Sequence, residues 1–216
     1  MNEALRILAA DSEGLDAAIA ALRSGEPVVL PTDTVHGLAV IAGDSAALER
    51  VFELKRRPAE RSIAVLVASV DQAETLVEFS DAERRLGHAF WPGALTIIAH
   101  RRPDADPSIG RSDGTVGVRC PNEAFVRSLA ERLGPLATTS ANLSGESTPA
   151  TALEAAVALV GNVALVIDDG ERNGSASTVV RVRDGGFEIV REGAIGGSQL
   201  AAELGPGTTA RNSCQE

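Results

Sequence analysis

Short apolar segments of strand type alternate with amphipathic helical segments along most of this 216-residue chain. Val28–Leu30 is a continuous apolar run, as is typical of a strand that is buried on both faces of a sheet. Asp184-Gly185-Gly186 joins the last two strand-type segments as a hairpin. Crossover helices together with a hairpin predict a mixed sheet. The chain is therefore expected to be an α/β protein, with helices flanking a mixed sheet.

The expected elements follow from apolar periodicity and from residues that cap or end helices. Strands are expected at Val28–Leu30, Val35–Ile41, Ile63–Ala68, Leu95–Ala99, Val116–Val118, Val163–Ile167, Thr178–Val182 and Phe187–Val190. Helices are expected at Ser12–Arg23, Asp44–Lys55, Val70–Phe79, Asp81–Phe90, Asn122–Leu133, Thr151–Val160 and Ser198–Leu204, with Ser12, Asn122 and Thr151 as N-caps. Residues 1–206 are expected to form one domain. Residues 207–216 are poor in apolar side chains and are expected to be a disordered tail.

Composition excludes several classes of protein. No run of about 18 apolar residues is present, so no membrane span is expected, and the first residues lack the pattern of a signal peptide. Cys120 and Cys214 are far apart and join only three histidines, which favours a reducing cytoplasm and argues against a zinc site. A net charge of −10 argues against indiscriminate binding of nucleic acid. Base-stacking platforms are not expected, because aromatic residues make up 3% of the chain.

The segment 134–149, G-P-L-A-T-T-S-A-N-L-S-G-E-S-T-P, is rich in short hydroxyl and amide side chains. Leu136 and Ala137 form a short strand-type beginning, and a loop is expected from Thr138 onward. Backbone N–H groups in such a glycine-containing loop can converge on an anion, and the hydroxyls add further donors. A Ser/Thr-rich surface turn is the alternative.

Further polar groups follow expected strands, where ligands bind in α/β folds. Pro31–Leu38, P-T-D-T-V-H-G-L, directly follows an apolar strand, and Lys55–Arg61 holds four cations in seven residues. Arg119 and Arg191 each end an apolar strand, and a buried arginine requires an anionic partner such as a substrate carboxylate. No Ser/His/Asp or Cys/His set is evident. The pattern therefore favours catalysis by positioning and charge neutralisation over a covalent mechanism.

Seven motifs, in this order and spacing, carry a resemblance to a known family: P-T-D-T-V-H-G-L, K-R-R-P, W-P-G-A-L-T, T-V-G-V-R, T-S-A-N-L-S-G, S-T-V-V and R-E-G-A-I. Over residues 5 to 204, the chain resembles the YrdC-like family, the L-threonylcarbamoyladenylate synthases of tRNA modification. It is similar to the short, single-domain form. The resemblance implies an open, twisted α/β sheet with a positively charged concave face.

The resemblance also implies a reaction. Threonine and bicarbonate give N-carboxy-threonine, whose carboxylate attacks the α-phosphate of ATP. Threonylcarbamoyl-AMP and pyrophosphate are formed, and a downstream transferase complex moves the threonylcarbamoyl group to tRNA. Mg²⁺ would bridge phosphate oxygens, and no protein side chain is assigned as a metal ligand. The first step does not require tRNA, and the enzyme is expected in the cytoplasm.

The family's functional residues carry over onto matching positions of this sequence. The resemblance implies a catalytic set that engages the ATP phosphates, namely Lys55, Arg57, Ser140 and Asn142. Further nucleotide contacts are implied for Arg61, Thr115, Thr148 and Arg191. Threonine is expected at Thr34, Arg119, Thr138 and Ser177, with Arg119 as the partner of its carboxylate.

Three positions depart from the family pattern: His36 stands in place of tyrosine, Ser62 in place of proline, and Leu66 in place of a polar residue. They lie at the edge of the expected pocket, and they bear on affinity more than on reaction type. Two alternatives remain open. One is a non-enzymatic, RNA-binding paralogue of the same fold. The other is a carbamoyl-transfer module of the hydrogenase-maturation type, which usually occurs within a longer chain.

Overall fold

A computed structural model describes residues 5–56, 63–159, 163–205 and 208–212 of the chain. The strands are β1 Arg6–Ala9, β2 Val28–Leu30, β3 Gly37–Ile41, β4 Ala64–Leu66, β5 Val77–Glu78, β6 Leu95–Arg101, β7 Thr115–Arg119, β8 Leu136–Ser140, β9 Leu165–Asp168, β10 Thr178–Arg183, β11 Gly186–Arg191 and β12 Thr209–Asn212. The helices are α1 Ser12–Arg23, α2 Ser45–Leu54, α3 Val70–Glu74, α4 Asp81–Phe90, α5 Ala124–Leu133, α6 Ala152–Val157 and α7 Gly197–Leu204.

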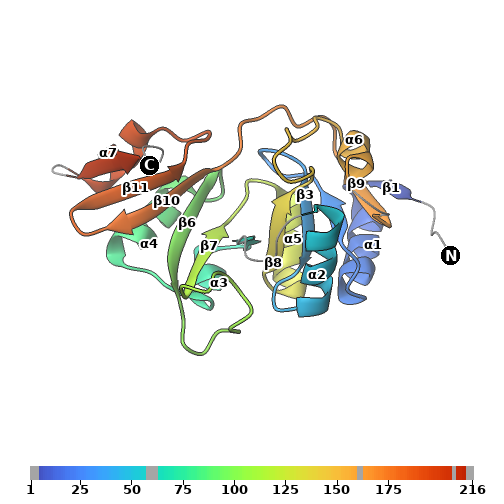
Figure 1. The fold of residues 1–216 in the computed structure, drawn as a ribbon, viewed down its shortest axis with the longest axis horizontal. Helices are drawn as coiled ribbons and strands as arrows, with labels where there is room; N and C mark the ends of the chain where they lie inside the picture. Colours follow the sequence, from blue (N-terminus) through green and yellow to red (C-terminus); the bar gives the residue numbers. More distant parts are fainter. Residues whose placement is uncertain (1–4, 57–62, 160–162, 206–207, 213–216) are drawn as a thin grey trace.

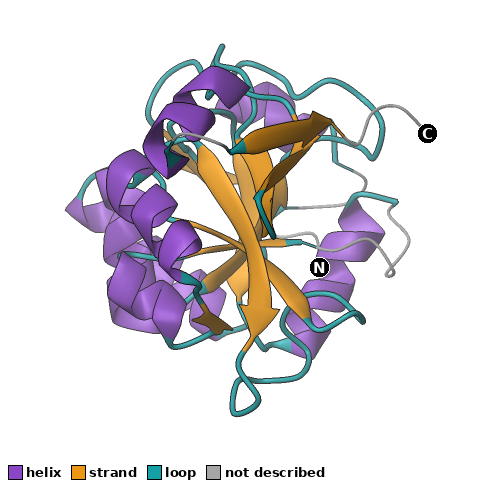
Figure 2. Ribbon diagram, turned by 90° about the vertical axis from the view of Figure 1, so that its left-hand side faces the viewer, coloured by secondary structure: helices purple, strands orange, loops and turns teal. Residues whose placement is uncertain are grey.

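One mixed sheet runs through the described molecule in the order β1-β9-β2-β3-β8-β4-β7-β6-β10-β11-β12, with β5 paired to β6. The sheet is open and strongly twisted, and helices flank it (Figures 1 and 2). The sheet contains both parallel pairs, such as β4–β7, and antiparallel pairs, such as β6–β7. The predicted fold class, an α/β fold with an open, twisted mixed sheet, is confirmed.

In the half of the sheet formed by β1, β9, β2, β3, β8 and β4, the edge strand β1 is largely exposed, whereas helices cover both faces of the inner strands. Alternation along β2 explains this, since Val28 and Leu30 pack with α1 and α5 whereas Val29 packs with α2 and α6. Leu22 of α1 and Val51 of α2, each 1% exposed, lie on opposite sides of the sheet. A strand buried on both faces needs apolar residues at every position, which is the pattern that β2 shows.

The other half, from β7 through β12, has its described helices on one face. Ile97, Val118 and Val180 point to that face and pack with residues of α3, α4 and α7. The residues adjacent to these along the strands, such as Thr96 and Gly117, point to the opposite face and line a cavity. This uncovered face, where the chain has small and polar residues, positions the candidate site.

The residues that cap the helix N-termini agree with the predicted caps in one case and differ in two. Ser80 and Glu83 form a capping box at α4, and Thr151 caps α6 in the same way, as predicted for Thr151. The predicted caps at Ser12 and Asn122 are wrong, because the acidic residue one position away accepts the backbone N–H bond. Asp11 accepts from Gly14 at α1, and Glu123 accepts from Phe125 at α5.

Three expected segments differ in structure. The expected loop from Thr138 is strand β8 as far as Ser140, because it pairs with β3 and β4 on its two sides. The expected helix Val70–Phe79 ends at Glu74, and Val77–Glu78 is a short strand on β6. Within the expected disordered tail, Thr209–Asn212 pairs in parallel with β11. Among the described residues, no helix combines the length and apolar character that crossing a bilayer requires.

Candidate functional site

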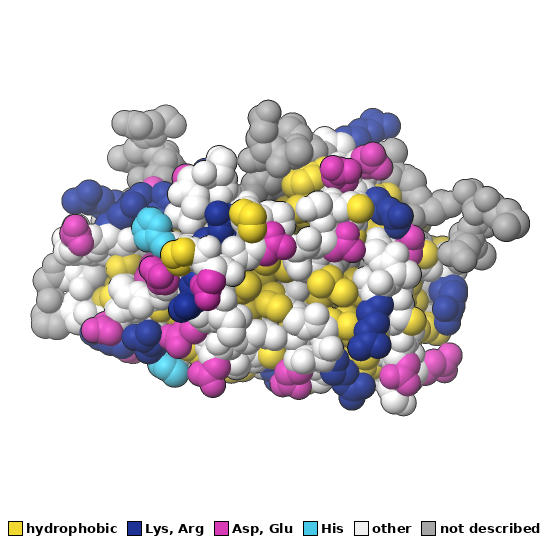
Figure 3. Space-filling model, turned by 90° about the horizontal axis from the view of Figure 1, so that it is seen from below, with side chains coloured by type: hydrophobic (Ala, Val, Ile, Leu, Met, Phe, Trp, Pro, Cys, Tyr) yellow, Lys and Arg dark blue, Asp and Glu magenta, His cyan; other side chains and the backbone are white. Residues whose placement is uncertain are grey.

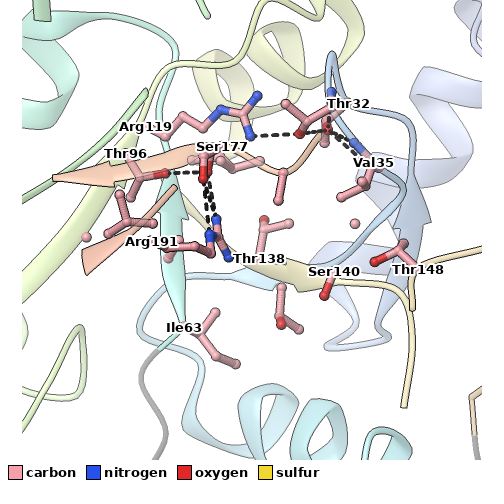
Figure 4. A pocket seen from close by; sticks show the side chains of 18 of the residues that line it. Thr32, Val35, Ile63, Thr96, Arg119, Thr138, Ser140, Thr148, Ser177 and Arg191 are labelled. Atoms are coloured by element: carbon pink, nitrogen blue, oxygen red, sulfur yellow. Dashed lines mark hydrogen bonds between the residues drawn. The ribbon is translucent and has the colours of Figure 1, made fainter. Parts of the chain in front are cut away.

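A cavity of about 430 Å³ lies on the uncovered sheet face, between the two halves of the molecule. This volume is within the range of about 300–1,000 Å³ that is typical of small-molecule sites. Arg119 and Arg191 lie toward one side of the cavity, and Ser140 and Thr148 toward the other (Figure 4). Hydroxyl groups from four strands or strand ends line it, at Thr34, Thr96, Thr138, Thr139, Ser140 and Ser177.

The four residues predicted to bind threonine all line this cavity, at Thr34, Arg119, Thr138 and Ser177. They come from the turn after β2, the end of β7, the middle of β8 and the residue before β10. Each is less than 9% exposed. The structure thus brings together residues that lie up to 143 positions apart in the sequence, from position 34 to position 177.

Arg119 is held by protein groups on each of its three nitrogens. Its Nε donates to Gly93 O at 2.9 Å, Nη1 to Thr34 Oγ1 at 2.9 Å, and Nη2 to Asp33 Oδ1 at 2.5 Å. Burial lowers the pKa of the Arg119 guanidinium, and the adjacent Asp33 carboxylate partly offsets this. The anionic partner expected for a buried arginine is therefore present within the protein.

Asp33 was not predicted as a site residue, although it stands between Thr32 and Thr34 in the P-T-D-T motif. A carboxylate beside two hydroxyls at a strand end was the available signal. Its pairing with Arg119 joins positions 86 residues apart and depends on the fold. Because the Asp33 carboxylate balances its charge, Arg119 can still orient a ligand by hydrogen bonds, but it attracts an anion less strongly.

Arg191 differs from Arg119 in its electrostatic setting. Its Nη2 donates to Ser177 O and Oγ, each at 2.9 Å, and Ser177 Oγ also lies 2.8 Å from Thr96 Oγ1. Partial burial, followed by the charge of Arg119, lowers the pKa of Arg191. No carboxylate of the described residues forms an ion pair with Arg191. Its charge is therefore available at the rim of the cavity for a bound anion.

Lys55, Ser140 and Asn142 form one connected unit at the end of β8. The Lys55 side chain is 1% exposed, and its Nζ donates to Ser140 O, to Asn142 O at 2.5 Å and to Asn142 Oδ1 at 3.2 Å. Ser140 Oγ donates to Asn142 Oδ1 at 2.5 Å. Ser140 and Asn142 line the cavity, whereas Lys55 lies behind them at the end of α2. Lys55 thereby orients the turn that faces a ligand.

The remaining predicted nucleotide residues are placed in different ways. Thr148 lines the cavity. Thr115 does not line it, and its hydroxyl donates to Asp113 Oδ1 at 2.6 Å. Arg57 and Arg61 lie outside the described residues.

Of the three positions that depart from the family pattern, Leu66 lines the cavity and Ser62 lies outside the described residues. His36 is fully buried behind the cavity wall, where its Nε2 lies 3.0 Å from Ala150 O. The carbonyl can only accept, so Nε2 carries the proton. Nδ1 is then a buried acceptor, and none of the described residues donates to it. Burial lowers the pKa of His36.

Charge attraction at this site is local. On the face of the molecule seen from below, Lys and Arg side chains are interspersed with Asp and Glu side chains (Figure 3).

Within the described parts of the chain, no three His, Cys, Asp or Glu side chains gather as a metal site would require. Glu146 is the acidic residue among those that line the cavity in the described structure.

Comparison with known families identifies the fold. The family model Sua5/YciO/YrdC, described as telomere recombination, matches residues 20–193. The chain belongs to this family. The resemblance that the seven motifs indicated is thus confirmed.

Members of the family with assigned names are similar over most of the chain. A threonylcarbamoyl-AMP synthase of Mus musculus is 35% identical over 191 residues, which cover 84% of this chain and 68% of that protein. A threonylcarbamoyl-AMP synthase of Bacillus subtilis is 36% identical over 193 residues and covers 88% of this chain. The matched region spans 56% of the length of the Bacillus protein.

Solved structures show the same fold. Sua5 of Pyrococcus abyssi, complexed with L-threonine, has a TM-score of 0.86 and 30% identity, and covers 95% of this chain. This chain spans 62% of that one. YciO of Escherichia coli has a TM-score of 0.79 at 24% identity and supports the fold alone.

Proposed function

We propose that this protein is a threonylcarbamoyl-AMP synthase. In this reaction L-threonine, bicarbonate and ATP give threonylcarbamoyl-AMP, pyrophosphate and water, which makes the enzyme a nucleotidyltransferase. One observation carries the proposal: a hydroxyl-lined cavity has a buried arginine, Arg119, and an arginine that pairs with no carboxylate of the described residues, Arg191, opposite the Ser140–Asn142 turn. The names of similar family members support the same activity.

The cavity suits two anionic groups of different kinds. On the Arg119 side, the guanidinium and the hydroxyls of Thr34, Thr138 and Ser177 form a small polar site that fits an amino acid. Phosphates fit better near Arg191 and the Ser140–Asn142 turn, where positive charge and N–H or O–H donors are available. We infer that Arg57, Arg61 and Thr148 extend the nucleotide side, as the resemblance implies, whereas Thr115, also implied there, does not line the cavity.

The chemical step requires positioning rather than a protein nucleophile. An oxygen of N-carboxy-threonine forms a bond to the α-phosphorus of ATP, and the bond from that phosphorus to the bridging oxygen breaks. Pyrophosphate leaves with the bonding electrons. Arg191 and the donors of the Ser140–Asn142 turn would neutralise charge that develops on the phosphate oxygens, which is the main catalytic contribution in phosphoryl and nucleotidyl transfer.

ATP would bring Mg²⁺, and the described residues fit this ion. Mg²⁺ keeps several waters and binds through substrate phosphates and one or two carboxylates. Glu146 supplies a carboxylate at the cavity. The ion would neutralise charge on the phosphates, while Lys55 keeps the Ser140–Asn142 turn in place.

Threonylcarbamoyl-AMP is a reactive mixed anhydride, so a second protein must accept it. We infer that a threonylcarbamoyl transferase complex consumes it to modify tRNA, and that the enzyme works in the cytoplasm. The first step needs no tRNA in this scheme.

A direct assay tests the proposal. Purified protein is mixed with ATP, Mg²⁺, threonine and bicarbonate, and pyrophosphate and threonylcarbamoyl-AMP are measured by coupled assay and mass spectrometry. Both products are expected only when all four components are present. ATP binding without threonine-dependent pyrophosphate release would contradict the proposal, and tight tRNA binding in the same preparation would then favour an RNA-binding role.

A further inference from the structure

Arg172 lies in the loop between β9 and β10 and does not line the cavity. Its side chain is 16% exposed, and its guanidinium donates to five acceptor atoms, one of which is Glu171 O at 3.4 Å from Nη1. Nη2 pairs with Glu123 Oε2 at 3.2 Å and with Asp169 Oδ2 at 2.7 Å, and Nη1 donates to Asp169 O at 2.7 Å. Nε donates to Thr32 O at 2.8 Å. One side chain thus ties its own loop to the start of α5 and to the turn after β2.

The backbone of the same loop holds two walls of the cavity together. Arg172 N donates to Ala150 O at 2.8 Å, and His36 Nε2 lies 3.0 Å from the same oxygen. The loop also approaches the turn after β2 closely, since a Cβ on Gly174 would lie 2.9 Å from Thr34 O. The segment that ends at Ala150 and the turn around Thr34 are therefore packed against one loop.

The contact with Thr32 O bears directly on Arg119. Thr32 Oγ1 closes a turn by donating to Val35 O at 2.6 Å and accepting from Thr34 N at 3.2 Å. That turn presents Asp33 Oδ1 and Thr34 Oγ1 to the Arg119 guanidinium. If the Thr32 carbonyl moves, both partners of Arg119 move with it.

We propose that Arg172 is a positioning residue for the Arg119 side of the cavity. It acts through the Thr32–Val35 turn and contacts no ligand itself. The role needs a planar guanidinium, because Nε reaches Thr32 O and Nη2 reaches the two carboxylates, whereas a lysine presents all its donors from one nitrogen. That the ligand on this side is threonine rests on the proposed function.

The first test compares two variants by steady-state kinetics. Arg172→Met keeps the apolar stem and removes the charge, and Arg172→Lys keeps the charge and removes the fork. In both, KM for threonine is expected to rise roughly tenfold, as for loss of about one hydrogen bond, while KM for ATP stays within about twofold. Equal increases for both substrates, or an unchanged KM for threonine in a folded variant, would overturn the proposal.

Arg84→Met is the matched control. Arg84 also forms two ion pairs, with Glu74 at 2.7 Å and Asp81 at 3.3 Å, but it lies on α4, away from the cavity. If the loss of ion pairs acted only through general destabilisation, Arg172→Met and Arg84→Met would change the KM for threonine alike. Arg84→Met is therefore expected to leave both KM values unchanged. If it raises KM for threonine as much as Arg172→Met does, the specific role of Arg172 is wrong.

A second measurement does not depend on the activity. Amide hydrogen exchange is compared in the wild type, Arg172→Lys and Arg84→Met without ligands. Faster exchange at Thr34 and Val35 is expected only in Arg172→Lys, because their N–H groups are bonded within the turn that Arg172 holds. Unchanged exchange would contradict the positioning role even in an active enzyme. Faster exchange in Arg172→Lys, together with a wild type that forms no adenylate, would uphold the positioning role while the proposed function fails.

Discussion

At the scale of single residues, the pairing of Arg119 with Asp33 determines how the cavity can hold a carboxylate. Arg119→Lys keeps a positive charge but cannot donate at once to Gly93, Thr34 and Asp33, which the guanidinium does in the wild type. Threonine binding is therefore expected to weaken by about 1.5–3 kcal/mol, the value of a hydrogen bond to a charged group. ATP affinity should stay nearly constant.

Calorimetric titration of each ligand into each variant measures this, with Arg191→Lys as the control. Because Arg191 has no carboxylate partner among the described residues, Arg191→Lys is expected to weaken ATP more than threonine. If Arg119→Lys weakens ATP as much as threonine, Arg119 belongs to the nucleotide side.

Lys55 is expected to affect both stability and activity. Its ammonium satisfies Ser140 O, Asn142 O and Asn142 Oδ1 in the interior. Lys55→Met removes the donor that these three acceptors share and should lower the free energy of unfolding by about 1–3 kcal/mol. Adenylate formation should fall strongly as the Ser140–Asn142 turn moves. Urea unfolding and the pyrophosphate assay give the two values, and a variant that loses activity at full stability would indicate direct contact with phosphate instead.

His36 is expected to make stability depend on pH. Burial lowers its pKa below the ordinary value of 6.5, so below pH 6.5 the unfolded chain binds a proton that the folded chain does not. Unfolding free energy should therefore fall as pH decreases from 6.5, and His36 should contribute no pH dependence above it. His36→Gln keeps an N–H donor for Ala150 O and removes the titration. Thermal melts from pH 8 to pH 5 should show a smaller decrease in His36→Gln than in the wild type, whereas His100→Gln, at an exposed site, should match the wild type.

At the scale of helices and strands, local chemistry predicts some elements and long-range pairing decides others. The boundaries of α4 were predictable because its capping residues lie beside it in sequence. Strand β8 was expected to be a loop from Thr138, since hydroxyl residues near glycine are typical of turns. It is a strand because β3 and β4 supply hydrogen-bonding partners on both sides, and those partners come from 70 or more positions away. The same limit applies to the site. Arg119 was predicted from its place at a strand end and from the resemblance, but the fold was needed to reveal Asp33 and Arg172.

Strand β12 changes the expectation for the C-terminal tail. Thr209–Asn212 pairs with Gly186–Ile189 of β11, whereas Arg191, which faces the cavity, lies beyond the paired residues. Truncation after Pro206 should therefore lower the free energy of unfolding by about 1–3 kcal/mol through lost ladder hydrogen bonds. Both KM values should be unchanged. Urea denaturation and kinetics of the truncated protein measure this, and a loss of activity in the folded state would show that the tail acts at the site.

At the scale of the whole molecule, the cavity lies where two packed regions share one sheet. β4 belongs to both, since Val65 packs with the α3, α4 and α7 side and Leu66 packs with α1 and α5. β8 pairs with β4, and β4 pairs with β7, so the ladder is continuous across the cavity. A ligand that contacts Thr138 on one side and Ser177 on the other therefore binds to both regions at once.

This architecture predicts one cooperative unfolding transition that ligands shift as a whole. A ligand that binds only the folded state at 100 times its Kd should raise the free energy of unfolding by about 2.7 kcal/mol. Differential scanning calorimetry of the free protein should show a single peak, and saturating threonine with a non-hydrolysable ATP analogue should move that peak without splitting it. In Arg119→Lys, threonine should produce a smaller shift while the ATP analogue still produces a full one. Two separate peaks, of which only one responds to ligands, would mean that the regions on either side of the cavity unfold independently despite their shared sheet.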